Sequence, residues 1–249
     1  MRTVPYSDIV QEEMTRNGSA EDWIHGLQHV ERVLENWQWL VCSSEKIDPR
    51  LARLLQVAAY FHDVKKHDVG AFRNHAEASA AFFLSQDLAE FTEEEKADIA
   101  FAIRYHNVGL RKLGYRADCR RNILLALLCV IDGMDSACYV GYYRVLGWFG
   151  QKGEPFDLFG KYSAQELEPL LQEDLSEAAL EALKDRGALV PHLICDLRIF
   201  RGTLDPVMDL LGVDFLIETE RRMANLRKEI GKLIKLKIKN EKPLRFFGN

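Results

Sequence analysis

The amino-acid sequence predicts an all-α protein, and three observations support this fold class. Helix-start signals recur along the chain, and apolar residues repeat at the spacing of one helix face. No window shows the strict alternation of apolar and polar residues that is typical of a half-buried strand. We therefore expect a helical bundle followed by a C-terminal helical extension, without a β-sheet.

Capping residues mark the starts of the expected helices. Asp48 precedes Pro49, so a capping carboxylate stands before a proline that suits the first helical turn. The helix that begins there is expected to end at His62 and Asp63. Further starts are marked by two capping boxes and a second Asp-Pro pair, namely Thr92 with Glu95, Ser163 with Glu166, and Asp205-Pro206.

Two further segments carry an apolar stripe at helical spacing. In HVERVLENWQWLV the stripe consists of His29, Val33, Trp37 and Leu40. A long basic helix is expected over about residues 215–239, with an apolar face of Phe215, Leu226, Ile230, Leu233 and Ile234. Its lysines and arginines are interpreted as a charged outer face.

The domain organisation is predicted as a core of residues 1–150 and an extension of residues 151–249. The segment GWFGQKGEPFD, which is rich in glycine and aromatic residues, is the expected seam. No low-complexity linker separates the two halves, so we expect the extension to pack on the core. An exposed apolar helix would also allow a homodimer.

The composition narrows the functional classes. The 249 residues are 47% hydrophobic and 29% charged, which is ordinary for a globular protein. A net charge of −5 argues against a dedicated nucleic-acid-binding protein. Five scattered cysteines without a CxxC pair indicate reduced thiols, not a disulfide framework or a thiolate zinc site.

Neither a targeting segment nor a membrane segment is evident. The start of the chain lacks a charged stretch followed by an apolar one, which is the pattern of a signal peptide. The longest apolar run covers residues 123–131, about half the length that a membrane span needs. We therefore expect a cytoplasmic protein without a membrane partner.

A histidine next to a carboxylate ends the apolar run before His62 and Asp63. Burying a carboxylate is costly unless a cation or hydrogen bonds compensate it. His29, on the preceding expected helix, and Asp132, directly after an apolar one, offer further ligands of the same two kinds. This mixture of nitrogen and oxygen suits an octahedral divalent cation, namely manganese, iron, cobalt, nickel or magnesium. The alternative for His62 and Asp63 is a hydrogen-bonded pair that only ends the helix.

Three ordered segments, HGLQHVERV, YFHDVKK and VIDGMDS, resemble the HD superfamily of metal-dependent phosphohydrolases in its HDxxHxxRV…HDxxK…D variant. The resemblance covers about residues 20–140 and implies an all-helical HD domain. The metal ligands that it implies are His29, His62, Asp63 and Asp132, with Lys66 at the lysine of the motif. NHAEASA and IRYHN resemble segments that supply His75 and His106 to a second metal or to substrate. Gly133 stands where the family usually has arginine or another long side chain.

The resemblance implies hydrolysis of a phosphoester or phosphoanhydride in a small phosphorylated molecule, with a nucleotide as the expected substrate. A bound cation lowers the pKa of water and polarises a phosphoryl oxygen. Asp63 and Lys66 are expected to act in catalysis. Fixed cations stabilise a transferring phosphoryl group, and the candidates for binding it are Lys66, Arg111, Lys112 and Arg116. In RYHNVGLRKLGYRADCRR six basic residues face a single acid, Asp118, and a solvated basic face is the alternative interpretation of that loop.

Several interpretations stay open at this point. If His75 and His106 join the site, it resembles that of the HD-type di-iron oxygenases; otherwise these two histidines serve local structure. A regulatory module that binds a nucleotide without hydrolysing it is a third function. His25 is either a fifth ligand or a residue that orients the helix start, and Glu77 and Asp135 are candidates for handling protons or orienting ligands.

Overall fold

The computed structural model of the chain describes residues 6–22, 24–67, 74–136, 157–170 and 188–241. The elements are α1 (Tyr6–Arg16), α2 (Leu27–Ser43), α3 (Pro49–Phe61), α4 (His75–Leu84), α5 (Glu93–Tyr105), α6 (Gly109–Leu113), α7 (Arg120–Ser136), α9 (Ala164–Leu170), α11 (Leu189–Leu204), the 3-10 helix η2 (Asp205–Leu210) and α12 (Val213–Glu241). Within the described ranges no β-strand occurs, and one isolated bridge joins Asp157 to Ala188. The predicted all-α class is confirmed. None of the described helices is both long and apolar enough to cross a membrane.

The chain divides into two compact units that interleave along the sequence. The first consists of Met1–Asp135 together with Phe200–Thr219, and the second consists of Ser136–Ile199 together with Glu220–Asn249. We call Phe200–Thr219 the return segment, because the chain comes back to the first unit there. The boundary predicted near residue 150 lies in the range 137–156, outside the described residues.

The capping signals act as the sequence predicts. The side chain of Asp48 accepts hydrogen bonds from the backbone N–H groups of Arg50 and Leu51, and α3 then runs to Phe61. Thr92 and Glu95 form a reciprocal capping box at the start of α5. These caps satisfy backbone donors that the first turn of a helix leaves without partners. The caps fix where α3 and α5 begin. They therefore also help to fix the positions of His62 and His106, which directly follow the ends of these helices.

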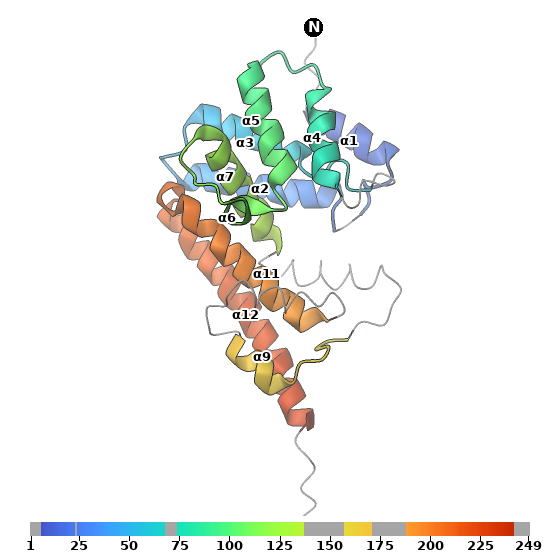
Figure 1. The fold of residues 1–249 in the computed structure, drawn as a ribbon, viewed down its shortest axis with the longest axis vertical. Coiled ribbons are helices and arrows are strands. Elements are labelled where there is room, and N and C mark those ends of the chain that lie inside the picture. Colours follow the sequence, from blue (N-terminus) through green and yellow to red (C-terminus); the bar gives the residue numbers. More distant parts are fainter. Residues whose placement is uncertain (1–5, 23, 68–73, 137–156, 171–187, 242–249) are drawn as a thin grey trace, which may run out of the picture. The chain divides into compact units, whose positions relative to one another are not determined.

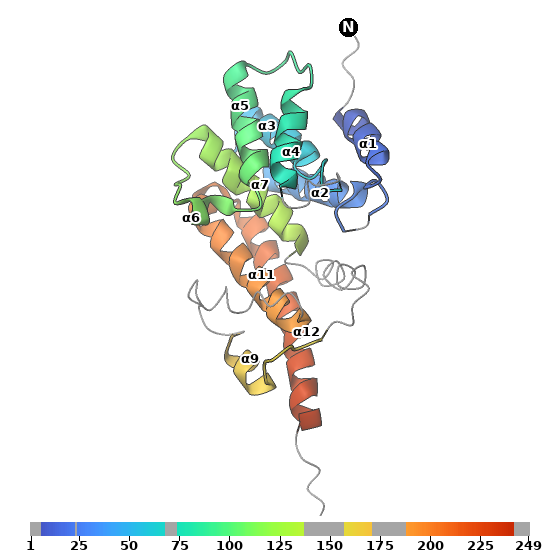
Figure 2. The same cartoon turned by 45° about the vertical axis from the view of Figure 1, so that its right-hand side comes forward.

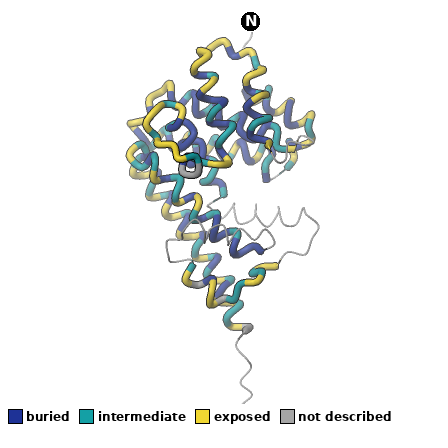
Figure 3. The backbone as a smooth tube through the Cα atoms, in the orientation of Figure 1, coloured by how far each residue is buried: buried dark blue, intermediate teal, exposed yellow. Residues whose placement is uncertain are grey.

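The first unit is built around α3. Contacts join α3 to α1, α2, α4 and α5, and α4 packs along α5, as both views show (Figures 1 and 2). The side chains of Leu54, Leu55 and Phe61 on α3 are fully buried. Buried positions accordingly run through the middle of this unit, and exposed positions lie on its outer turns (Figure 3).

The turn after α3 is fixed to α1 by buried polar contacts. Lys65 Nζ donates to Glu13 Oε1 at 2.5 Å, and Glu13 is itself buried. The amide of Asn17 donates to the carbonyl oxygen of Val64 at 2.8 Å. The backbone N–H of Lys65 donates to Ser79 Oγ on α4. These contacts hold the turn that carries the His-Asp pair between two helices.

The return segment is packed closely against the end of α2. A Cβ atom on Gly212 would clash with the backbone carbonyl of Ser43, so only glycine fits there. Ser44 Oγ donates to the carbonyl oxygen of Leu210 at 2.5 Å. The rings of Trp39 and Phe215 lie 4.6 Å apart between centroids, a separation typical of packed aromatic pairs.

The second unit shows the predicted apolar face of the long helix. Leu226, Ile230 and Ile234 of α12 are buried, as expected, and Leu233 is half-buried. Lys237 of the same helix donates to the carbonyl oxygen of Tyr162 and lies over the ring of Phe159. The Ser163–Glu166 capping box forms at the start of α9.

Candidate metal centre

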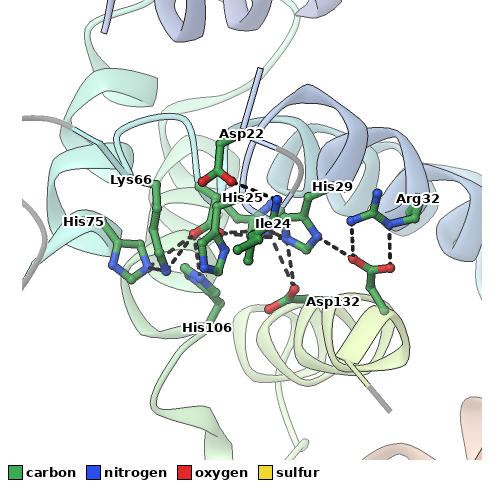
Figure 4. Close-up of polar contacts among 12 residues, drawn as sticks. Asp22, Ile24, His25, His29, Arg32, Lys66, His75, His106 and Asp132 are labelled. Atoms are coloured by element: carbon green, nitrogen blue, oxygen red, sulfur yellow. Dashed lines mark hydrogen bonds and ion pairs between the residues drawn. The ribbon is translucent and has the colours of Figure 1, made fainter. Parts of the chain in front are cut away.

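Four side chains from three helices converge on one space. His29 lies in the first turn of α2, His62 and Asp63 directly follow α3, and Asp132 lies in the last turns of α7. The Nε2 atoms of His29 and His62 are 3.1 Å apart. Asp132 Oδ1 lies 3.3 Å from the first nitrogen and 3.8 Å from the second. The structure therefore brings together the residues that the sequence marks as metal ligands; of these, His29 and Asp132 are labelled in Figure 4.

Asp63 lies between two groups of nitrogen atoms. Its Oδ2 atom is 3.8 Å from His29 Nε2 and 4.0 Å from His62 Nε2. Its Oδ1 atom is 3.2 Å from His75 Nε2 and 3.4 Å from His106 Nε2. Figure 4 shows His75, His106 and Lys66 gathered together, with Arg32 beyond His29 on the opposite side. One buried carboxylate thus faces both sets of histidines.

Hydrogen bonds on the far side of three rings fix which nitrogen carries the proton. His29 Nδ1 lies 2.7 Å from Asp135 Oδ2. His62 Nδ1 lies 2.8 Å from the carbonyl oxygen of Ala59, and His106 Nδ1 lies 2.7 Å from that of Ile103. Because carbonyl and carboxylate oxygens only accept, each Nδ1 is assigned as the donor. In the neutral form of each ring, Nε2 then directs a lone pair toward the carboxylates.

This assignment of protons bears on whether a cation lies between His29 and His62. The two Nε2 atoms are 3.1 Å apart; when both rings are neutral with the proton on Nδ1, their lone pairs cannot form a hydrogen bond and repel unless a cation lies between them. Ligands at about 2.1 Å from an octahedral ion are about 3.0 Å apart when adjacent and about 4.2 Å apart when opposite. The ligand atoms of His29, His62 and Asp132 are 3.1 to 3.8 Å apart, within this range. Asp63 Oδ2 lies 3.8 and 4.0 Å from the two histidines, and Asp63 also forms an adjoining group with His62 and His106.

Asp63 supplies a second indication of a cation. Its Oδ1 atom is buried, and the nitrogens of His75, His106 and Lys66 lie 3.2 to 3.8 Å from it without a well-aligned hydrogen bond. A buried carboxylate oxygen that lacks a well-aligned hydrogen bond is costly, and a cation would compensate its charge. The donor set of imidazole nitrogen and carboxylate oxygen suits manganese, iron, cobalt, nickel or magnesium. The residues present therefore fit a divalent cation.

The electrostatics keep the ligands in the state that binds a metal. Burial, the largest effect, lowers the pKa of His62 to about 4, so this ring is neutral near pH 7. Burial alone would raise the pKa of Asp63, but Lys66 and the surrounding histidines hold it well below its usual value. The pKa of Asp132 is likewise lowered by the neighbouring histidines, of which His29 has the largest effect, against the opposing effect of burial. Neutral imidazoles and ionised carboxylates are the forms that coordinate metals.

The residues of this centre differ in their exposure to solvent. The side chains of His29, His62 and Asp63 are 0 to 4% exposed, whereas that of Asp132 is 25% exposed. His25, whose Nδ1 lies 3.5 Å from Asp63 Oδ2, is 22% exposed. Lys66 is 15% exposed. The side bordered by these three residues is where water and a small ligand can approach.

His25 is held in a tightly wound loop before α2. A Cβ atom on Gly26 would clash with three backbone carbonyls of the same loop, those of Ser19, Ala20 and Asp22. This explains why glycine follows His25 where the motif variant has aspartate. Asp22 also accepts from His67 Nε2 at 2.6 Å, which connects the loop to the turn after Asp63.

Lys66 lies beside the second group of histidines. Its Nζ atom is 3.8 Å from Asp63 Oδ1 and 3.1 Å from His75 Nε2. The predicted proximity of Lys66 to the carboxylate therefore holds, and His75 and His106 both adjoin the same oxygen. A positive charge next to Asp63 is available for an anionic ligand.

Two arginines of the basic segment around His106 are paired with acids, so they are less available for a phosphate than the sequence indicates. Arg104, on α5, pairs with Glu77 at 2.5 Å, and Arg120, at the start of α7, pairs with Asp98 at 2.6 Å. These acids come from other helices, so the expectation that Asp118 is the single acid facing the loop is wrong. Arg116 is exposed. The side chains of the other two predicted phosphate-binding residues, Arg111 and Lys112, lie outside the described part of α6.

Two functional residues were not identified from the sequence. Arg32 donates from Nε to Asp135 Oδ1 at 2.7 Å and from Nη2 to Asp135 Oδ2 at 3.1 Å. Asn36 is buried and donates to the carbonyl oxygen of Ile131 at 2.9 Å. The spacing of His29, Arg32 and Asn36 along one helix was the available signal, since residues three and four apart share a face. Among the candidates, Asp135 orients His29, and Glu77 pairs with Arg104.

Comparisons with known proteins bear on the fold alone. The chain matches no protein-family profile and no curated protein sequence. A crystal structure of a Lactobacillus plantarum protein, solved as a structural-genomics target, is similar in fold, with a TM-score of 0.60. The match covers 95% of this chain and 96% of that one, at 13% sequence identity. Both chains therefore share an arrangement of helices, and the chemistry rests on the residues of this chain.

Proposed function

We propose that this chain is a metal-dependent phosphohydrolase that cleaves a phosphoester or phosphoanhydride in a small phosphorylated molecule, with a nucleotide as the expected substrate class. The observation that carries the proposal is the convergence of His29, His62, Asp63 and Asp132, with the Nε2 atoms of the two imidazoles 3.1 Å apart. The resemblance of the sequence to the HD superfamily supports the same reaction class.

A bound divalent cation supplies Lewis acidity and lowers the pKa of water. The protein contributes the geometry. His29 and His62 are locked by hydrogen bonds at Nδ1, so both rings keep their orientation when a substrate arrives. Asp63 is ionised and buried, and each of its two oxygens can interact with a positive charge. Asp132 lies at the open side of the centre.

Lys66 is the residue proposed to bind the phosphoryl group. Charge on the equatorial oxygens of a transferring phosphoryl is stabilised by fixed cations nearby. The ammonium of Lys66 lies 3.8 Å from Asp63 Oδ1, next to the metal ligands and at the accessible side. A nucleotide phosphate that binds at this side can pair with the ammonium of Lys66 beside the metal ligands.

The direct test is a substrate panel with metal analysis. Purified protein is loaded with manganese, cobalt or nickel and incubated with nucleoside mono-, di- and triphosphates, cyclic nucleotides and pyrophosphate-bearing nucleotides. We expect metal-dependent release of phosphate, pyrophosphate or a nucleoside from at least one member. Folded protein that binds the metal but turns over none of them would contradict hydrolysis and favour a regulatory module that binds a nucleotide.

A second candidate function is a di-iron oxygenase. The observation that favours it is the contact of His75 and His106 with Asp63 Oδ1, at 3.2 and 3.4 Å, which offers a second pair of nitrogens around a shared carboxylate. Elemental analysis and the absorption spectrum of protein purified with iron separate the two proposals. Two irons per chain with dioxygen consumption would support the oxygenase, whereas turnover with manganese or nickel would exclude it as the main activity.

The location that we propose for this enzyme is the cytoplasm. The five cysteines of the sequence are odd in number and scattered, and the four that the structure describes are free thiols. Free thiols are typical of a reducing compartment.

A further inference from the structure

The turn that carries the last metal ligand packs against the return segment. A Cβ atom built on Gly133 would lie 2.5 Å from Cδ2 and 3.0 Å from Cε2 of the Phe200 ring. Phe200 is buried. One residue further, Met134 Sδ accepts from Thr219 Oγ1 at 3.3 Å, and both side chains are buried. The residues directly after Asp132 therefore lie against a helix that the chain forms more than sixty positions later.

The opposite side of the same turn is fixed to α2. Asn36 Nδ2 donates to the carbonyl oxygen of Ile131 at 2.9 Å, and Arg32 pairs with Asp135 at 2.7 Å. The last turns of α7 thus have polar attachments to the helix that carries His29 and a close apolar contact with Phe200. A displacement of these turns changes the distance between His29 and Asp132, which is 3.3 Å between Nε2 and Oδ1.

We propose that Phe200, seated on Gly133, is a positioning residue of the metal centre, so that the return segment sets the distance between Asp132 and the two histidines. Gly133 stands at the sequence position where the resembling family usually has a long side chain, and the Phe200 ring lies against it. The absence of a side chain at Gly133 therefore leaves the space in which the Phe200 ring lies. This inference rests on the metal site of the proposed function, and it is independent of which bond the enzyme cleaves.

The size of the expected effect follows from two lengths. Carbon atoms in contact are normally about 3.5–4.0 Å apart, so a methyl group at position 133 requires a movement of about 1 Å. Metal–ligand distances tolerate about 0.2 Å. A buried ring on a helix has no exposed space to enter, because Phe200 is surrounded by protein. The turn with Asp132 must therefore shift by more than the coordination allows.

The experiment measures Mn²⁺ affinity, by calorimetry and by the EPR signal of free Mn²⁺, for four full-length proteins. These are the wild type, Gly133→Ala, Phe200→Leu and the double variant Gly133→Ala/Phe200→Leu. We expect Gly133→Ala to remain helical by circular dichroism and to bind Mn²⁺ at least about 10-fold more weakly, the loss typical of displaced supporting groups. Leucine lacks Cε2, and its Cδ atoms branch from a tetrahedral carbon, so they can rotate away from position 133 as the planar ring cannot. The double variant should therefore return to within about 3-fold of Phe200→Leu alone.

Gly231→Ala is the matched control, because no atom lies within 4 Å of a Cβ at that position of α12. It should keep wild-type Mn²⁺ affinity and a wild-type melting temperature, or a slightly higher one. Wild-type affinity in folded Gly133→Ala would overturn the proposal, as would a loss that the double variant does not reverse. If Gly133→Ala alone does not fold, the double variant provides the test. A double variant that folds but does not recover Mn²⁺ binding would also overturn the positioning role of Phe200. A wild type that binds no Mn²⁺ refutes the metal centre itself, which is a different outcome from failure of the positioning role.

Discussion

His29 Nδ1 lies 2.7 Å from Asp135 Oδ2, and the same carboxylate accepts two hydrogen bonds from Arg32. Asp135 is buried. An arginine, a carboxylate and an imidazole thus form a chain that ends at the Nε2 lone pair facing Asp132. Such chains fix the tautomer and the ring orientation of a ligating histidine and raise its basicity.

Asp135→Asn tests this chain. The amide can still accept a hydrogen bond through its oxygen, but it loses the charge that pairs with Arg32 and favours the proton on Nδ1. We expect the dissociation constant for Mn²⁺ to rise about 10–100-fold while the helical content stays unchanged. Calorimetry on the purified variant measures it. Glu229→Gln, which removes the charge of a carboxylate paired with Lys232, should leave the affinity unchanged, and an equal loss in both variants would contradict the role of Asp135.

Metal binding should raise the melting temperature. At a free Mn²⁺ concentration of 100 times the dissociation constant, binding to the folded state alone adds about 2.7 kcal/mol. For a protein of this size we expect a rise of about 5–10 °C, which calorimetric scans with Mn²⁺ and with EDTA will measure. Asp63→Asn and Asp132→Asn should abolish the rise, because each removes a ligand. A rise of the same size in either variant would show that Mn²⁺ binds elsewhere.

Two neighbouring lysines should behave in opposite ways. Lys66 lies 3.1 Å from His75 Nε2 beside the metal ligands, whereas Lys65 pairs at 2.5 Å with the buried Glu13. We expect Lys66→Met to lower turnover of the substrate identified in the panel by about 100-fold or more, with little change in the melting temperature of the Mn²⁺-loaded protein, because the bound cation still compensates the charge of Asp63. Lys65→Met should keep most of the activity of the folded protein but lose about 1–3 kcal/mol of stability, because Glu13 loses a buried partner. Reversed results, with Lys66 needed for stability and Lys65 for turnover, would contradict the proposed roles.

The fold class and the members of the centre could be predicted from local signals. The caps at Asp48 and Thr92 depend on residues two or three positions apart, and both form. His62 and Asp63 were recognisable because an apolar helix ends in them. In each case the physical cause lies within one helical turn, which a single sequence displays.

Contacts between distant helices could not be predicted in the same way. The stripe expected on α2 contained Trp37, which is half-buried, whereas the neighbouring Asn36 is buried because its amide satisfies the carbonyl of Ile131. Gly133 departs from the usual long side chain of the resembling family, and the structure places the Phe200 ring where a Cβ at that position would clash. The surplus charge after His106 is reduced by acids on other helices. All three features depend on which helices contact each other, and the periodic spacing of apolar residues does not predict those contacts.

Glu95 makes the stability of the first unit depend on pH. Its hydrogen bonds with Arg50, and secondly with the backbone of Thr92, lower its pKa from 4.5 to about 2. Because the folded-state pKa is depressed, the stabilisation is fully present above pH 4.5 and is lost as the pH falls toward 2. We expect Glu95→Gln to lower the melting temperature at pH 7 by an amount corresponding to about 1 kcal/mol, and the difference from the wild type should shrink between pH 4.5 and pH 2.

Thermal scans of both proteins across this range measure the effect. Glu93→Gln, in the same first turn of α5 but 90% exposed and paired only with Lys96, is the matched control and should differ little from the wild type at any pH. A difference between wild type and Glu95→Gln that stays constant down to pH 2 would show that the carboxylate charge does not stabilise α5. The start of the helix that leads to His106 would then be held by Thr92 alone.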